Sequence, residues 1–283
     1  MTLNEYLQIA SNDLKKHGIS SSRLDTLILI ENVIGKDRSW ILANLNDEID
    51  SKNIKKINKL LKLRQSHIPI AYIINKVEFY NHIFFVNHDV LVPRPETETM
   101  IDIFKGIYHE EEKKLNKLFT DTHKLSVVDI GTGCGAIGIS TYLEVPNINI
   151  DLIDNDPKAL KVAKINVDKL TPGLNLYLSN LLENVNNNYD VILANLPYVS
   201  DTLDINVDAK HEPKQAIFAS DNGLSLYQKL FKQINKLDYQ PLYILIEAFP
   251  SQHTEITNLA MNIGYKPQFI KDFIIAFKYI SNK

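Results

Sequence analysis

Near its middle the sequence reads Val127-Val128-Asp129-Ile130-Gly131-Thr132-Gly133-Cys134-Gly135. The apolar run predicts a buried strand, and the glycines that follow predict a tight turn into a helix. Further strands, separated by helical segments, are expected at 148–153, 174–178, 191–194 and 243–246, and a final antiparallel pair at 269–279. Strands that alternate with helices predict an α/β fold with a doubly wound, mostly parallel sheet.

The residues ahead of this sheet predict a different architecture. Residues 1–74 show helical periodicity and predict a small helical bundle, with capping boxes at Thr2–Glu5 and Ser22–Asp25 and with Trp40 packed between the helices. Residues 75–92 contain two short aromatic or β-branched runs, which predict a hairpin linker. The third part, residues 93–283, carries the sheet.

The overall composition is that of an ordinary globular protein. The chain has 283 residues, 23% of them charged, and a formal net charge of -3, so no overall basic field is available for stable nucleic-acid binding. A single cysteine, Cys134, excludes an intrachain disulfide and fits a reducing compartment. No apolar run is long enough to span a bilayer, and no secretory signal is recognised. We therefore expect a cytoplasmic protein with no membrane association, and we predict no metal site.

The glycine loop is a candidate cofactor site because ligands bind at the carboxyl ends of strands in such sheets. Gly131-x-Gly133-x-x-Ala136 also matches a dinucleotide fingerprint, so a nicotinamide enzyme is an alternative. Asp129 precedes the loop, where its charge opposes a pyrophosphate and suits the cationic S-adenosylmethionine. Asp154 ends the second strand, where a carboxylate accepts hydrogen bonds from ribose hydroxyls. Cys134 has no base placed to activate it and is interpreted as a small loop residue.

The fourth strand runs directly into Asn195-Leu196-Pro197-Tyr198. The side-chain oxygen of Asn195 and the carbonyl oxygen of Leu196 are suited to accept hydrogen bonds from an amide or adenine NH₂ group. Such contacts would aim the nitrogen at a methyl group and stabilise its developing positive charge. Tyr198 is placed to stack against the acceptor. The motif predicts an acceptor site for methylation of a planar nitrogen.

Several motifs together resemble the peptide-chain release factor glutamine methyltransferases, the PrmC/HemK family. Pro93-Arg94-Pro95-Glu96-Thr97-Glu98 is similar to that family's signature ahead of its catalytic domain. Pro69–Ile73 and Glu78–Tyr80 resemble its linker, and His211–Pro213 with Asp221–Leu224 resemble the stretch after its acceptor loop. The similarity covers nearly the whole chain.

The resemblance implies a Rossmann-like methyltransferase domain with a seven-stranded sheet behind a substrate-recognising helical bundle. It also implies transfer of a methyl group from S-adenosylmethionine, with S-adenosylhomocysteine as product, to N5 of the glutamine in the Gly-Gly-Gln motif of release factors. A monomer that binds release factors is expected. The residues expected at the cofactor are Asp129, Gly131, Thr132, Gly133, Cys134, Gly135, Asp154, Asn180, Leu181 and Asn195, and the expected catalytic residues are Asn195, Leu196, Pro197 and Tyr198.

The chain departs from the family pattern in its acceptor motif, which leaves alternatives open, and in its linker, which does not. The family's acceptor motif is Asn-Pro-Pro-Tyr, whereas this chain has Leu196 at the second position, and Asn-Leu-Pro-Tyr also resembles the motif of ribosomal RNA adenine dimethyltransferases. RNA adenine N6-methylation and a non-catalytic, cofactor-binding interaction protein are therefore the competing hypotheses. Asn75 and Asn81 stand where the family often has glycine, and asparagine tolerates the positive φ that such turns require.

Overall fold

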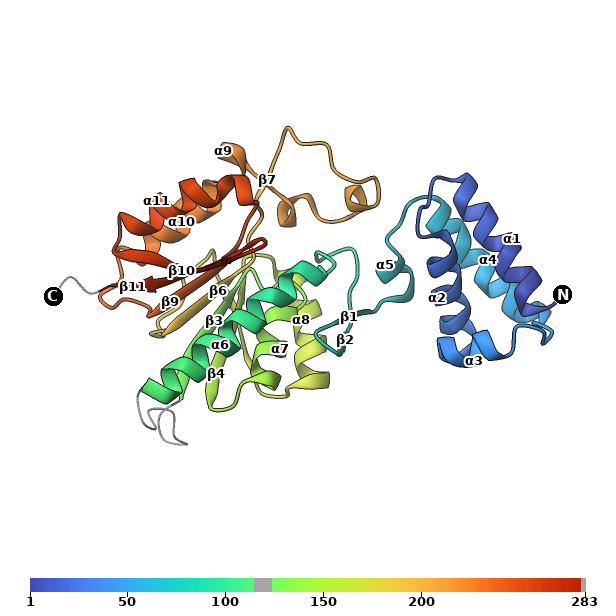
Figure 1. Ribbon diagram of the computed structural model, residues 1–283, viewed down its shortest axis with the longest axis horizontal. Helices are drawn as coiled ribbons and strands as arrows, with labels where there is room; N and C mark the ends of the chain where they lie inside the picture. Colours follow the sequence, from blue (N-terminus) through green and yellow to red (C-terminus); the bar gives the residue numbers. More distant parts are fainter. Residues whose placement is uncertain (115–123, 281–283) are drawn as a thin grey trace. The chain divides into compact units, whose positions relative to one another are not determined.

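A computed structural model describes residues 1–114 and 124–280 of the chain (Figure 1). Contacts divide the chain into two compact units, one of residues 1–76 with 205–211 and the other of residues 77–204 with 212–283. Within the described ranges, no helix has the length and apolar character that a membrane crossing requires.

The first unit is a bundle of short helices. They are α1 (Leu3–Lys16), α2 (Ser22–Ile34), α3 (Arg38–Ala43), α4 (Ser51–Gln65) and α5 (Ile70–Ile74). The predicted capping box at the start of α1 is confirmed, because Thr2 and Glu5 exchange side-chain to backbone hydrogen bonds of 2.9 and 3.2 Å. Apolar side chains of α1, α2, α3 and α4 form one continuous core.

Two predictions for this bundle are wrong. The start of α2 has no side-chain cap; instead Asp25 accepts a hydrogen bond of 2.7 Å from Arg64 of α4, and both side chains are buried. The Asp25 carboxylate therefore forms a long-range ion pair with Arg64 instead of the predicted capping box with Ser22. Trp40 does not pack between helices: it is 37% exposed, and the Lys36 ammonium group lies 5.5 Å from its ring centroid.

The second unit opens with a hairpin formed by β1 (Val77–Phe79) and β2 (His82–Phe84). Its turn places Tyr80 and Asn81 at φ values of 48° and 61°, and Asn75 has a φ of 53°. Asparagine therefore stands in the left-handed conformation at both positions, as predicted.

The central sheet has seven strands and is mostly parallel, as predicted. Its strands are β3 (Leu125–Ile130), β4 (Ile148–Asp154), β5 (Asn175–Leu178), β6 (Val191–Ala194), β9 (Tyr243–Glu247), β10 (Tyr265–Lys271) and β11 (Ile274–Tyr279). The strand order is β10-β11-β9-β6-β3-β4-β5, and only the pairs that include β11 are antiparallel. The chain builds outward from β3 to β5 and then returns to β6, so the order reverses between β3 and β6. Ligands bind at such a switch point.

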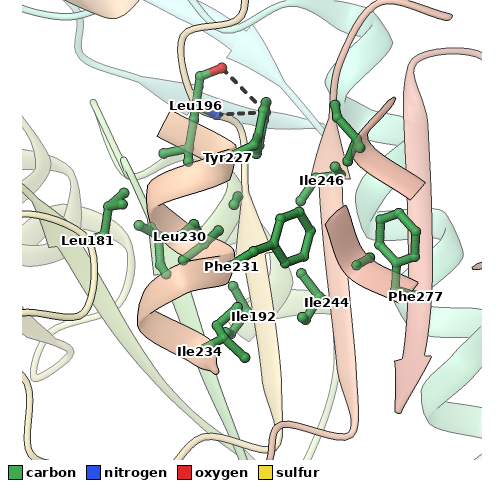
Figure 2. Close-up of a cluster of buried hydrophobic side chains, with 14 of the residues drawn as sticks. Leu181, Ile192, Leu196, Tyr227, Leu230, Phe231, Ile234, Ile244, Ile246 and Phe277 are labelled. Atoms are coloured by element: carbon green, nitrogen blue, oxygen red, sulfur yellow. Dashed lines mark hydrogen bonds between the residues drawn. The ribbon is translucent and has the colours of Figure 1, made fainter. Parts of the chain in front are cut away.

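Helices cover both faces of this sheet. On one side lie α6 (Glu98–Lys114), α7 (Ala136–Glu144) and α8 (Pro157–Leu170), and on the other α10 (Ser225–Ile234) and α11 (His253–Met261) (Figure 1). Figure 2 shows Leu230, Phe231 and Ile234 of α10 packed against Ile192 of β6 and Ile244 of β9. This packing anchors β6 and β9 against α10. The remaining short elements are η1 (Pro95–Thr97), β7 (Val199–Ser200), η2 (Asp208–His211), η3 (Lys214–Ala216), β8 (Phe218–Ala219), α9 (Ser220–Gly223) and η4 (Pro250–Gln252).

Candidate active site

A pocket lies at the carboxyl ends of the strands, beside the switch point. Residues from the loops after β3, β4, β5 and β6 line it, together with residues 89–91 and several residues between 213 and 226. Of the residues predicted to form the site, those that line the pocket are Gly131, Gly133, Asp154, Asn180, Leu181, Asn195, Leu196 and Pro197. Those that do not are Asp129, Thr132, Cys134, Gly135 and Tyr198.

The glycine loop turns sharply between β3 and α7. The N–H groups of Gly131 and Thr132 both donate to the carbonyl oxygen of Ile153, each at 2.9 Å, which ties the loop to β4. Gly133 has a φ of 57°, and a Cβ added there would meet no atom within 4 Å. Because Gly133 lines the pocket, the missing side chain leaves room for a ligand to approach the backbone.

Asp154 closes the pocket at the end of β4. Its Oδ2 accepts from the Gly133 N–H and its Oδ1 from the Asp156 N–H, each at 2.9 Å. Burial raises the pKa of this carboxyl, while these backbone hydrogen bonds lower it in part. Each oxygen retains acceptor capacity for a further donor. The carboxylate is therefore fixed in place and suited to accept hydrogen bonds from a pair of ligand hydroxyls.

Asp129 supports the loop from below rather than lining the pocket. Its side chain is fully buried, and Oδ2 accepts from the Thr132 hydroxyl at 2.6 Å and from the Gly138 N–H at 2.9 Å. Burial raises the pKa of this carboxyl from 3.8 to about 6. Its other oxygen, Oδ1, has no hydrogen-bond partner among the described residues. A buried negative charge with a free oxygen favours a cationic ligand over a phosphate above it.

Cys134 is a structural residue of the loop. It is buried, and burial raises the pKa of its thiol to about 12, so it is not a thiolate at neutral pH. Its carbonyl oxygen accepts a hydrogen bond of 2.8 Å from Asn166 of α8. Its side chain takes no part in lining the pocket.

The acceptor loop contacts the glycine loop directly. A Cβ at Gly131 would lie 3.0 Å from Cδ2 of Leu196, closer than most Cβ contacts, and the φ of 73° at Gly131 favours glycine as well. The Leu196 side chain is buried in the core that α10 covers. Figure 2 shows Tyr227 of α10 beside the Leu196 backbone, with its hydroxyl 3.4 Å from both the nitrogen and the carbonyl oxygen. The single Tyr227 hydroxyl hydrogen has a closer acceptor, the Glu247 carbonyl oxygen, so the Leu196 carbonyl keeps its capacity to accept from a substrate.

The segment Pro93–Glu98 supports the acceptor loop. Asn195 Nδ2 donates to the hydroxyl oxygen of the buried Thr97 at 3.2 Å, which leaves Asn195 Oδ1 as the oxygen available to a substrate NH₂ group. The Arg94 guanidinium donates to Glu212 Oε1 at 2.5 Å, and the Val92 N–H donates to Glu212 Oε2 at 3.0 Å. Arg94, to which the sequence assigned no role, therefore clamps this segment to the chain beyond the acceptor loop.

Three side chains and one glycine contact Tyr198 and were not predicted from the sequence. Glu247 accepts the Tyr198 hydroxyl at 2.9 Å, and Phe249 packs edge-to-face against its ring. Gln252 donates to the Tyr198 carbonyl oxygen at 2.8 Å, and a Cβ at Gly223 would lie 1.9 Å from that oxygen. Glu247 ends an apolar strand, as Asp154 does, so the same pattern could have indicated it. Phe249 and Gln252 carry no local signal, whereas Gly223 lies in the stretch Asp221–Leu224, which resembles the family.

Two family models match the chain. The PrmC N-terminal domain matches residues 5–74, and the methyltransferase small domain matches residues 113–217. A release factor glutamine methyltransferase of Mycoplasma mycoides is 34% identical over 273 residues, which cover 93% of both chains. The chain belongs to the release factor glutamine methyltransferase family. The family member of Bacillus subtilis is 30% identical, over 96% of this chain and 94% of its own.

A longer relative is similar to this chain over most of the chain's length. The bifunctional methyltransferase of Rickettsia prowazekii is 32% identical over 95% of this chain, which spans about half of that protein, 54%. Among solved structures, the catalytic domain of hMettl16 in complex with an RNA hairpin superposes with a TM-score of 0.53 at 13% identity, covering 70% of this chain and 76% of that one. That likeness shows the fold of the methyltransferase domain.

Proposed function

We propose that this family member methylates the side-chain amide nitrogen N5 of the glutamine in the Gly-Gly-Gln motif of peptide-chain release factors. The observation that carries the proposal is the contact between the two loops: Gly131 and Leu196 meet at the switch point, so methyl donor and acceptor would share one crevice. The names of the full-length relatives support this choice of substrate.

The residues that line and support the pocket match the chemical groups of S-adenosylmethionine. The Gly133 backbone leaves room for close approach, and Asp154 would hold the ribose hydroxyls. Asn180 and Leu181, which also line the pocket, would flank the adenine, and the buried charge of Asp129 would favour the cationic end of the molecule. When bound, the cofactor supplies a methyl group on a positively charged sulfur.

The acceptor loop would position the glutamine amide for in-line attack. Asn195 Oδ1 and the Leu196 carbonyl oxygen would each accept one N–H of the amide, which directs the nitrogen lone pair toward the methyl carbon. In the transfer, the amide nitrogen would bond to the methyl carbon as that carbon leaves the sulfur with the bonding electrons left on sulfur, and the nitrogen would release one proton to water. The same two oxygens stabilise the positive charge on the nitrogen during transfer.

Leu196 is compatible with this role. The residue contributes its backbone carbonyl to the proposed site, while its side chain is buried in the same core as Leu224 and Leu230. Pro197 restricts the residue before it to extended conformations, which keeps the carbonyl direction fixed.

The helical bundle of the first unit is proposed to recognise the release factor, with the enzyme acting as a monomer.

The test is to incubate the purified protein with methyl-labelled S-adenosylmethionine and a release factor. We expect label on the wild-type release factor and none when the motif glutamine is replaced by alanine. The variant Asn195→Ala should lose most labelling, because it removes one of the two acceptor oxygens, and its cofactor affinity is measured alongside. Equal labelling of both release factors, or labelling of ribosomal RNA alone, would contradict the proposal.

A further inference from the structure

Glu247 is a buried carboxylate beside the acceptor loop. It ends β9, which runs parallel to β6 with Ile246 opposite Ala194, so Glu247 and Asn195 follow on neighbouring strands. Only 2% of Glu247 is exposed, and its Oε1 accepts the Tyr198 hydroxyl at 2.9 Å. The strand register therefore brings a carboxylate to the acceptor motif.

Tyr198 is held from several directions, and Glu247 fixes its polar end. The Phe249 ring lies edge-to-face with the Tyr198 ring, at a centroid distance of 4.9 Å. The Tyr198 carbonyl oxygen accepts from Gln252 at 2.8 Å. Together these contacts fix the position of the Tyr198 ring and of its backbone.

Among the described residues, none of the ion pairs includes Glu247, and its Oε2 is buried without a hydrogen-bond partner. The titratable or charged groups that act on it or on its hydrogen-bonded partner are Arg94, Glu96, Tyr198 and Tyr227. Burial raises the pKa of Glu247, and neighbouring polar side chains lower it in part. Burying an unpaired carboxylate is costly in the resting protein. A positive charge that develops nearby during the reaction offsets this desolvation penalty, so the buried carboxylate stabilises the transition state.

We propose that Glu247 is a positioning residue for methyl transfer, which holds Tyr198 against the acceptor amide and keeps a negative charge beside the nitrogen as it becomes positive. The inference rests on the proposed function. The charge acts through the Tyr198 hydroxyl and through the low-dielectric environment of the strand ends. The attraction between the carboxylate and the nitrogen grows as the nitrogen is alkylated. It therefore lowers the barrier to methyl transfer more than it strengthens substrate binding.

Two variants separate the hydrogen bond from the charge. Glu247→Gln keeps an oxygen that accepts from Tyr198 and removes the charge, whereas Tyr198→Phe keeps the ring and removes the donor. A matched control pair exists at the opposite end of the same strand, where the Tyr243 hydroxyl donates to Glu111 Oε1 at 2.6 Å. Glu111→Gln and Tyr243→Phe therefore remove the same types of group far from the acceptor loop.

The experiment measures kcat and KM for release factor at saturating S-adenosylmethionine, together with cofactor affinity by calorimetry as a check of folding. We expect Glu247→Gln to lower kcat by about tenfold or more while KM changes by less than about threefold. The kcat of the double variant Glu247→Gln with Tyr198→Phe should lie within about twofold of the kcat of the slower single variant, because the two residues act as one unit. Both control variants should match the wild type.

The dependence of kcat on pH provides a second readout. Wild-type kcat should fall on the acidic side as Glu247 becomes protonated, and this decline should be absent in Glu247→Gln. Saturating cofactor keeps the buried carboxyls of Asp129 and Asp154 from controlling the profile through cofactor binding. Unchanged kcat and pH profile in Glu247→Gln, or effects that add in the double variant, would overturn the inference. If the wild type labels no release factor at all, the proposed function fails and the inference fails with it.

Discussion

Replacing Gly223 by alanine should disable the acceptor loop while leaving the cofactor pocket intact. The added Cβ would lie 1.9 Å from the Tyr198 carbonyl oxygen and 2.6 Å from Gln252 Nε2. Because Cβ contacts shorter than 3.0 Å essentially do not occur, the Tyr198 backbone must move by about 1 Å or more. A displacement of this size in a substrate-positioning group lowers the rate by about a hundredfold. Overpacking should also lower the free energy of unfolding by about 1–3 kcal/mol.

Gly18→Ala is the matched control for backbone strain. Gly18 has a φ of 81°, close to the 86° of Gly223, but no atom lies within 4 Å of its Cβ position. Both variants pay a strain of about 1 kcal/mol for alanine at positive φ, and only Gly223→Ala collides with the acceptor loop. The assay is kcat on release factor, with cofactor affinity and thermal unfolding measured alongside. Similar kcat for the two variants would refute the reasoning, since strain alone would then explain the loss.

Three further predictions address the cofactor loop and its support. Gly133→Ala should weaken S-adenosylmethionine binding by about tenfold or more in calorimetry, because its methyl group would enter the pocket; unchanged affinity would show that the ligand lies elsewhere. Burial raises the pKa of Asp129 from 3.8 to about 6, so the folded state binds the proton more tightly than the unfolded state does. As the pH rises through that range, the wild type should lose on the order of 3 kcal/mol of unfolding free energy relative to Asp129→Asn, as measured by urea unfolding. Arg94→Met should destabilise the protein by about 1–2 kcal/mol because Glu212 is left buried and unpaired, whereas Arg38→Met, which breaks an exposed ion pair, should cost less than about 0.5 kcal/mol; equal costs would contradict the proposed clamp.

The parallel sheet was predictable because its signals are local. The apolar run at 127–130 and the glycines after it predict a strand and a turn by themselves. Asp154 at the end of the next strand was predictable for the same reason, since strand ends in such a sheet meet at one edge. Thr2 and Glu5 form the predicted capping box because both partners lie within one helical turn.

Features that depend on distant partners were not predictable. Asp25 has the spacing of a capping box with Ser22, but Arg64, 39 residues further along the chain, binds its carboxylate instead. Similarly, Asn195 is oriented by Thr97, a contact that spans 98 residues. Such pairs arise from how the elements pack, and no periodicity or spacing in the sequence encodes them.

The role of Asp129 shows the limit of reasoning from position alone. Its place before the glycine loop predicted a contact with the cofactor, whereas its side chain is buried and hydrogen-bonded to Thr132 and the Gly138 N–H. The sequence indicates that a carboxylate follows a strand, but the direction of its side chain depends on the turn that comes after. Glu247 presents the reverse case: a strand-end carboxylate that position alone could have indicated.

The most direct test of the account is the site of methylation on the release factor. Wild-type enzyme, methyl-labelled S-adenosylmethionine and a release factor are incubated, and the peptide that contains the Gly-Gly-Gln motif is examined by fragment mass spectrometry. The proposed function predicts one added methyl group on the motif glutamine, and loss of most of this modification when Asn195→Ala replaces the wild-type enzyme. An unmodified motif glutamine in the presence of enzyme that binds the cofactor would contradict it.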